Sequence, residues 1–222
     1  MIHIPNFLLA MAKTIWITRH GNRYDFVNPD WFITAKLPYD PPLTEDGILQ
    51  AQELGERLKS ENISHIFSSP FLRTVQTAHE VAEILDLPVK LESGLGEWLN
   101  PDWMEHSPEI RSRETLAQQY PRIDLSYHSR IVPQYPETEE MVDQRTAQTA
   151  QQLAREFEGE LLFVGHGASV LGTVQGLLGE PINLHASFCC LTKLVQNKGC
   201  WEVELAGDTS HLSKTETKVR FN

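Results

Sequence analysis

The stretch TIWITRHG, residues 14–21, joins a strand-like apolar run to three residues that can carry chemistry. Residues 14–18 predict a buried strand, and the RHG triplet follows at its carboxyl end. In open α/β sheets, ligands bind at that edge. A second strand-like run, LLFV at 161–164, ends in GHG at 165–167. Either histidine–glycine pair alone is equally typical of an ordinary turn and of a functional site. The two together, with arginines nearby, predict a site for a phosphoryl group.

Length and composition suit one large α/β domain, or one domain that carries insertions. The chain has 222 residues, and 41% of them are apolar, which is enough for a packed core. Its formal net charge is −11 and it has no basic tract, which argues against a nucleic-acid partner. A few converging arginines can still make a small site positive, so the acidic balance is compatible with a phosphorylated substrate.

The three cysteines, Cys189, Cys190 and Cys200, have no CxxC spacing, so we expect no zinc site. We interpret them as core or strand residues rather than catalytic thiols, with Cys189 and Cys190 on opposite faces of a strand. An odd number of cysteines without a disulfide framework is typical of a reducing compartment, so we expect a cytoplasmic protein.

The N-terminus lacks the layout of a signal peptide and is too short to cross a bilayer. Met11 offers a second start, so residues 1–12 are expected to be an extension outside the fold. No other segment approaches the length of a membrane span, and we expect no membrane partner. Residues 13–222 are expected to form a single domain, with an irregular insertion at about 94–136 over the strand ends.

Apolar periodicity predicts an alternation of strands and helices along the chain. Strands are expected at 14–18, 63–67, 89–91 and 161–164, followed by a terminal hairpin at 188–196 and 200–205. Helices are expected from Thr44, from Pro70 with Ser69 as its cap, and at 108–119, 137–158 and 168–178. This alternation predicts a layered α/β fold with helices on both faces of the sheet.

A long irregular stretch at 22–42 is rich in proline and aromatic residues. Loops of this length are more often functional than idle. Its aromatic side chains either pack the loop onto the body of the domain or form a substrate wall above His20.

A histidine attacks phosphorus only through an unprotonated ring nitrogen, so another group, often a backbone carbonyl, must hold the proton of the other nitrogen. Cations must also neutralise the phosphoryl oxygens, and guanidinium groups grip these oxygens in pairs. Arg73 lies early in a predicted helix, whose free N–H groups favour an anion. The candidate nucleophile is His20, and the candidate phosphate ligands are Arg19, Arg23, Arg73 and His166.

The leaving group needs a proton, and Glu97 lies beside the large apolar ring of Trp98. An apolar setting raises the pKa of a carboxyl group and keeps its acid form available. Asp102 and Glu105 compete for the same role on chemistry alone. We favour Glu97 because Gly94 and Gly96 predict a tight turn that fixes its direction.

With these residues in place, the chain resembles the histidine phosphatase superfamily, which has the phosphoglycerate mutase-like fold. The matching parts follow the family's order over most of the sequence: Arg19-His20-Gly21, Pro42-Leu43-Thr44, Ser68-Ser69-Pro70 with Arg73 and Gln76-Thr77-Ala78, Glu97, and Gly165-His166-Gly167. The resemblance implies a three-layer α/β/α sandwich with a mixed, mostly parallel sheet. It also implies a phosphohistidine intermediate on His20, proton donation by Glu97, a catalytic and phosphate-binding His166, and no cofactor or required metal.

Within the superfamily, the spacing of Arg19-His20-Gly21-Asn22-Arg23 and the segments 72–78 and 92–98 are similar to the phosphatase domains of the suppressor-of-T-cell-receptor-signalling proteins. This likeness implies that Arg23 joins the phosphate pocket. True phosphoglycerate mutases usually have serine where Arg23 stands. Acid phosphatases and phytases usually carry His-Asp where this chain has His166-Gly167.

The leading hypothesis is a metal-independent phosphoric monoester hydrolase that acts on a small phosphorylated molecule or a phosphoprotein. One alternative is a phosphotransferase of the phosphoglycerate mutase type. The other is a non-catalytic module that binds phosphorylated ligands. The physiological substrate and the oligomeric state do not follow from the sequence.

Overall fold

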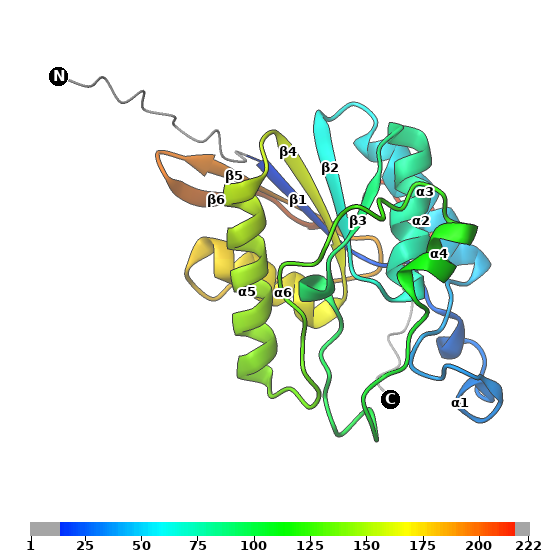
Figure 1. The fold of residues 1–222 in the computed structure, drawn as a ribbon. Coiled ribbons are helices and arrows are strands. Elements are labelled where there is room, and N and C mark those ends of the chain that lie inside the picture. The colour runs from blue at the N-terminus through cyan, green and yellow to red at the C-terminus, as the bar shows by residue number, and fades with distance from the viewer. Residues whose placement is uncertain (1–13, 216–222) are drawn as a thin grey trace.

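The computed structural model describes residues 14–215, whose backbone forms a mixed β-sheet between layers of helices (Figure 1). Six strands follow the order β3-β2-β4-β1-β5-β6. The first four are parallel, and β5 and β6 run antiparallel at one edge. The strands are β1 Thr14–Arg19, β2 Ile63–Ser68, β3 Val89–Leu91, β4 Glu160–Gly165, β5 Leu191–Asn197 and β6 Cys200–Asp208.

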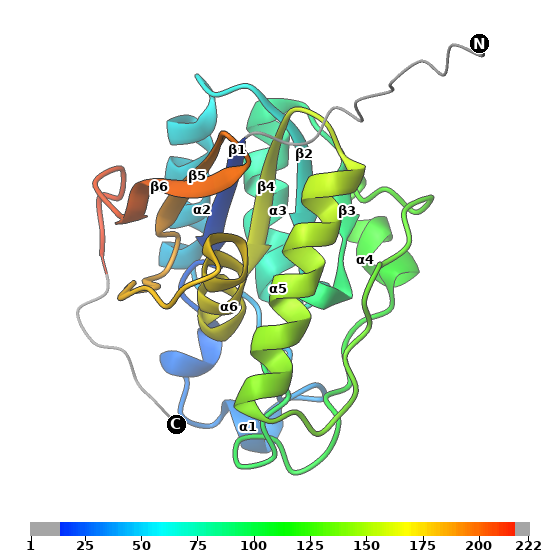
Figure 2. The same cartoon turned by 90° about the vertical axis from the view of Figure 1, so that its left-hand side faces the viewer.

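The layers arise because successive strand side chains point to opposite faces of the sheet. Trp16 belongs to the apolar core under α2 (Glu45–Leu58) and α3 (Leu72–Leu85). Its neighbours Ile15 and Ile17 belong to the core under α5 (Glu139–Glu156) and α6 (Gly167–Leu178), which Figure 2 shows in front of the sheet. The shorter elements are the 3-10 turns Tyr24–Phe26 and Ser93–Leu95 and the helices α1 Trp31–Thr34 and α4 Arg113–Gln119. The predicted three-layer α/β/α fold is confirmed.

Strand order places the two histidine-bearing junctions side by side. β1 and β4 pair in parallel, with Arg19 opposite Gly165. The backbone N–H of His20 donates to the Gly165 carbonyl at 3.0 Å, so the chain leaves both strands at the same point. His20 and His166 therefore emerge together at the carboxyl edge of the sheet.

Three predicted helices begin later in the structure than the sequence indicates, and one of them is α5, which begins at Glu139 rather than 137. α3 begins at Leu72 rather than Pro70, and Ser69 is not its cap. A carboxylate from a distant loop takes the place of the Ser69 cap: Asp40 accepts the N–H of Leu72 at 2.6 Å. α4 begins at Arg113 rather than 108, because the Ser112 side chain caps its first turn.

The C-terminal hairpin is confirmed, with one correction. Its turn lies at Lys198-Gly199, both with positive φ (51° and 87°), which matches the right-handed twist of a hairpin. Cys189 and Cys190 are both buried but precede β5 rather than alternating within a strand. Cys189 adopts a φ of 48°, and its N–H donates to the Arg19 carbonyl at 3.1 Å.

The loop at 22–42 and the segment at 94–136 meet beyond the carboxyl ends of the strands. Arg111 pairs with Asp40 at 2.7 Å, and the Tyr39 hydroxyl accepts the N–H of Glu105 at 3.0 Å. The division into one domain with an insertion stays a prediction, and the proposed extension at 1–12 lies outside the described residues. Among residues 14–215, no helix is both long and apolar enough to cross a membrane.

Candidate active site

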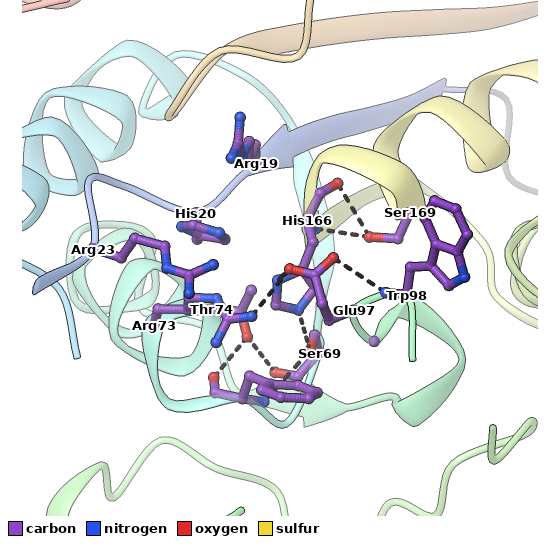
Figure 3. A network of polar contacts seen from close by, with 12 residues as sticks. Arg19, His20, Arg23, Ser69, Arg73, Thr74, Glu97, Trp98, His166 and Ser169 are labelled. Carbon is purple, nitrogen blue, oxygen red and sulfur yellow. Dashed lines mark hydrogen bonds and ion pairs between the residues drawn. The ribbon is translucent and has the colours of Figure 1, made fainter. Parts of the chain in front are cut away.

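His20 presents a free ring nitrogen at the end of β1 (Figure 3). Its Nδ1 lies 2.7 Å from the Gly21 carbonyl oxygen, and its side chain is buried. Because a carbonyl oxygen can only accept a hydrogen bond, Nδ1 carries the proton and Nε2 keeps its lone pair. Nε2 is buried and has no hydrogen-bond partner in the described part of the chain.

The surroundings of His20 keep its imidazole uncharged. Burial lowers the pKa of His20 well below its usual value, and the positive charges of Arg73 and Arg19 lower it further. A neutral ring with an available lone pair is the form that can attack phosphorus.

Gly21 is required by close packing behind His20 rather than by a special backbone conformation. A Cβ atom at Gly21 would lie 2.4 Å from the carbonyl oxygen of Gly47 in the first turn of α2. The Gly21 N–H donates to the Thr77 hydroxyl at 3.1 Å, which ties the loop after His20 to α3. Any larger residue at 21 would displace the backbone that holds the nucleophile.

The arginines predicted to bind phosphate line one pocket, which has a volume of about 730 Å³ and also includes Glu97 in its wall. Arg73 is 1% exposed, donates to the Tyr39 carbonyl at 3.3 Å and pairs with Glu97 at 3.1 Å. Burial lowers the pKa of Arg73 to about 10, so its guanidinium is still a cation at neutral pH. Arg19 and Arg23 complete the cationic end of the pocket.

Arg19 and Arg23 are each held by a neighbouring oxygen. The Arg19 Nη1 donates to the carbonyl of Ala186 at 2.9 Å. Arg23 makes two bonds of 2.6 Å to the buried carboxylate of Asp25, which fixes its guanidinium plane. Sequence reasoning missed Asp25, although an acidic residue two positions after a candidate arginine was a signal for it.

His166 faces His20, with the ring centres 5.3 Å apart in an edge-to-face arrangement. Its Nε2 lies 2.8 Å from the Ser69 hydroxyl, so Ser69 orients a site residue instead of capping a helix. Burial lowers the pKa of His166 to about 4, although the charge of Glu97 acts in the opposite direction. His166 is therefore neutral at pH 7.

Glu97 reaches both sides of the site. Its Oε2 lies 3.1 Å from Arg73 and 3.3 Å from Nδ1 of His166, and its Oε1 accepts the N–H of Trp98 at 3.1 Å. Of the two competing carboxylates, Asp102 lines the pocket, whereas Glu105 lies outside its lining.

The expectation of a raised Glu97 pKa is wrong for the described structure. Burial alone raises the pKa of Glu97, but its side-chain contact with His166 and the charges of Arg73 and Arg23 lower it well below its ordinary value. The sequence indicated the apolar neighbour Trp98 but not the charged groups that the fold brings to the carboxylate.

The aromatic residues of the 22–42 loop divide between the two roles considered for them. Trp31 packs the loop, because its Nε1 donates to the Pro38 carbonyl at 2.8 Å and it lines no part of the pocket. Aromatic side chains from both loops line the pocket beyond the arginines: Phe26, Phe32, Tyr39, Trp98 and Trp103. Within residues 14–215, no group of three or more His, Cys, Asp or Glu side chains is arranged to hold a metal ion.

The buried histidines make stability depend on pH. In the unfolded chain both His20 and His166 titrate near pH 6.5, whereas burial lowers their folded pKa values. Below that pH, the unfolded state therefore binds more protons than the folded state. As the pH falls, each ring removes about 1.4 kcal/mol from the free energy of unfolding per pH unit, until the pH reaches the pKa of that ring in the folded state.

We expect urea unfolding to show this loss between about pH 7 and about pH 5. A His20→Asn variant should have a shallower slope, because one of the two rings no longer contributes. An unchanged slope in the variant would contradict the proposed protonation state of His20.

The family model of the histidine phosphatase superfamily (branch 1) matches residues 15–209, which include every site residue described above. The chain belongs to the histidine phosphatase superfamily. Its relatives of the suppressor-of-T-cell-receptor-signalling type and its phosphoglycerate mutase-type relatives match at similar identities.

Three relatives illustrate the range of this histidine phosphatase family. The transcription factor tau 55 kDa subunit of Saccharomyces cerevisiae is 32% identical over 181 residues, which are 76% of this chain and 42% of that protein. The human ubiquitin-associated and SH3 domain-containing protein A is 28% identical over 84% of this chain and 34% of its own length. The probable phosphoglycerate mutase GpmB of Proteus mirabilis is 30% identical over 90% of this chain and 94% of its own. The chain thus spans less than half of the first two proteins.

Solved structures share the fold at lower identity. The ecdysone phosphate phosphatase of Bombix mori, in complex with tungstate, superposes with a TM-score of 0.77 at 22% identity, over 95% of this chain and 98% of that one. A phosphoglycerate mutase of Bacillus anthracis gives a TM-score of 0.65 at 22% identity, over 92% of this chain and 96% of that one. The fold is therefore common to enzymes named as phosphatases and as mutases.

Proposed function

We propose that this protein is a metal-independent phosphomonoesterase that works through a phosphohistidine on His20. The observation that carries the proposal is the buried, unpartnered Nε2 of a neutral His20, whose other nitrogen is held by the Gly21 carbonyl. The arginines of the pocket would neutralise the phosphoryl oxygens, and positioning with charge stabilisation supplies most of the catalysis in phosphoryl transfer.

In the first step, Nε2 of His20 forms a bond to phosphorus as the bond from phosphorus to the ester oxygen breaks. Glu97 gives its proton to the departing oxygen. In the second step, water attacks the phosphorus atom and gives a proton to Glu97 as the bond from phosphorus to Nε2 breaks. Inorganic phosphate then leaves, and His20 is restored. An arriving phosphate adds negative charge and shares Arg73, which raises the pKa of Glu97 toward its acid form.

The proposal is tested by hydrolysis of 4-nitrophenyl phosphate in the presence of EDTA, followed by rapid quenching at alkaline pH. We expect turnover and a phosphorylated peptide containing His20, because phosphohistidine survives base. Turnover without that adduct would overturn the covalent mechanism, and an absence of turnover toward a broad set of phosphomonoesters would overturn the activity.

A phosphotransferase of the phosphoglycerate mutase type is a second candidate. The match to the probable phosphoglycerate mutase GpmB, which extends over 94% of that protein, favours it. An assay with 3-phosphoglycerate, with and without 2,3-bisphosphoglycerate, separates the two, since only a mutase would form 2-phosphoglycerate.

A non-catalytic module that binds phosphorylated ligands is the third candidate. One relative is named as a transcription factor subunit, so not every relative carries the name of an enzyme. The complete set of His20, Arg73, Glu97 and His166 supports catalysis instead. The cytoplasmic location and the choice between a small substrate and a phosphoprotein stay predictions.

We propose that the site takes phosphate esters with a bulky apolar leaving group, because aromatic side chains line the pocket beyond the arginines. Phe32 is 43% exposed on this wall and packs against Tyr39. We expect Phe32→Ala to raise KM for 1-naphthyl phosphate about tenfold, the size of one lost aromatic contact, while KM for glycerol 2-phosphate changes little.

The matched control is Ile33→Ala, because Ile33 is the next residue, is 84% exposed and lies outside the pocket lining. Steady-state kinetics on both substrates measure the effect. Equal changes in KM for the two substrates in Phe32→Ala would show that this wall does not bind the leaving group.

A further inference from the structure

We infer that Arg145, paired with Glu137, is a positioning residue for the proton donor Glu97. The inference rests on the proposed function, because it concerns how Glu97 is held toward the leaving group. Arg145 lies on α5 and is not among the pocket-lining residues of the described chain. Its side chain is buried and each of its described hydrogen bonds goes to a protein oxygen, so it acts on the reaction through the residues that it contacts.

Arg145 grips the backbone of the turn that carries Glu97. Its Nη1 donates to the carbonyls of Gly94 at 3.0 Å and Gly96 at 3.2 Å. Its Nη2 donates to the backbone carbonyl of Glu97 itself at 3.1 Å. Three carbonyls within four consecutive residues are thus bound by one planar group, which restricts the rotation of the turn as well as its distance from α5.

Glu137 completes the arrangement from the other side. Its carboxylate receives Nε of Arg145 at 2.6 Å and Nη2 at 2.7 Å, so all five N–H donors of the guanidinium are used. The same carboxylate accepts the N–H of Leu99 at 3.1 Å, and the Glu137 carbonyl accepts Nε1 of Trp98 at 2.9 Å. The pair therefore fixes the chain on both sides of Glu97.

Burial makes this set of hydrogen bonds rigid. Arg145 and Glu137 are 6% and 4% exposed, so water cannot readily replace the bonds between them. The turn also packs directly on α5, since a Cβ atom at Gly94 would lie 2.1 Å from the Thr149 hydroxyl, one helical turn beyond Arg145. The glycine in this turn serves close approach to α5, and the arginine then sets the direction of the next residues.

The position of Glu97 matters because its Oε2 contacts both Arg73 and His166. A donor must lie within hydrogen-bond reach of the leaving oxygen, and a misplacement of about 1 Å can cost about 10²-fold in rate. A loosened turn should therefore impair proton donation while leaving the nucleophile and the phosphate ligands in place.

The test compares two substrates that need the donor to different extents. Phenyl phosphate releases a basic phenolate that requires a proton, whereas 4-nitrophenyl phosphate releases a stable anion. In Arg145→Lys the cation beside Glu137 remains, but one ammonium group cannot reach three carbonyls and two carboxylate oxygens. We expect kcat/KM for phenyl phosphate to fall about 30-fold and that for 4-nitrophenyl phosphate by less than about threefold.

The ratio of the two kcat/KM values does not depend on how much of the enzyme is folded, so a purely structural role would leave it unchanged. An unchanged ratio in Arg145→Lys would overturn the inference. If Arg145→Lys does not yield folded protein, Glu137→Gln carries the same expectation, because it removes the charge that holds the guanidinium. Arg130→Lys is the matched control, since Arg130 forms a partly exposed pair with Glu156 outside the pocket lining.

Glu97→Gln, assayed on the same substrates, separates failure of the inference from failure of the proposed function. If Glu97→Gln changes the ratio and Arg145→Lys does not, the positioning role alone is wrong. If Glu97→Gln leaves the ratio unchanged, the donor assignment and the inference that depends on it are both wrong. Adding Arg145→Lys to Glu97→Gln should change the ratio no further, because Arg145 acts through Glu97.

Discussion

Replacing His20 by alanine is expected to lower kcat toward 4-nitrophenyl phosphate at least about 10⁴-fold, because it removes the atom that accepts the phosphoryl group. The neighbouring imidazole, His166, has its Nε2 against the Ser69 hydroxyl at 2.8 Å and its Nδ1 3.3 Å from the Glu97 carboxylate. Steady-state and single-turnover assays measure the loss, and no phosphoenzyme should be trapped.

The control for this substitution is His128→Ala, since His128 is exposed and lies outside the pocket lining. His20→Ala should still bind inorganic phosphate, because the arginines of the pocket remain. A His20→Ala protein that retains more than about a tenth of the wild-type kcat would exclude His20 as the nucleophile.

Replacing Arg73 by methionine is expected to lower kcat/KM by about 10³-fold or more, the size typical of an arginine that stabilises a transferring phosphoryl group. Arg73 is 1% exposed and contacts Glu97, so the change removes a cation from both the phosphoryl oxygens and the proton donor. The pKa of Glu97 should rise as well, since Arg73 is one of the groups that lower it.

Arg73→Lys provides the comparison, because lysine keeps the charge but cannot bind two oxygens in a fixed plane. Its activity should lie between those of the wild type and Arg73→Met. Thermal unfolding of all three proteins separates catalytic loss from instability. If kcat/KM falls by less than about tenfold in both folded variants, Arg73 does not stabilise the phosphoryl group.

Several features followed from the chain itself. The runs at 15–17 and 161–164 are apolar without alternation because both faces of a central parallel strand are covered by helices. Polar residues directly after such runs lie at the carboxyl edge of the sheet, which is why the sequence alone indicates His20 and His166 as site residues. Local periodicity is sufficient for this kind of inference because strand and helix patterns are set by neighbours in sequence.

Other features misled because they depend on distant residues. Ser69 has the sequence of a helix cap, yet its hydroxyl meets His166, 97 positions away. The N–H of Leu72, the first residue of α3, donates instead to Asp40 from the aromatic loop. A polar side chain takes the nearest partner in space, and local sequence does not identify that partner.

Sequence alone established the strand–helix alternation, the two histidine junctions and the arginines beside them, because each depends on residues a few positions apart. The tertiary structure alone decided that β4 lies between β2 and β1, which brings His166 to His20. It also decided that Glu97 meets Arg73 and is carried by a turn bound to Arg145. These contacts join segments far apart in the chain, and their charges reverse the pKa shift that the apolar neighbour of Glu97 had indicated.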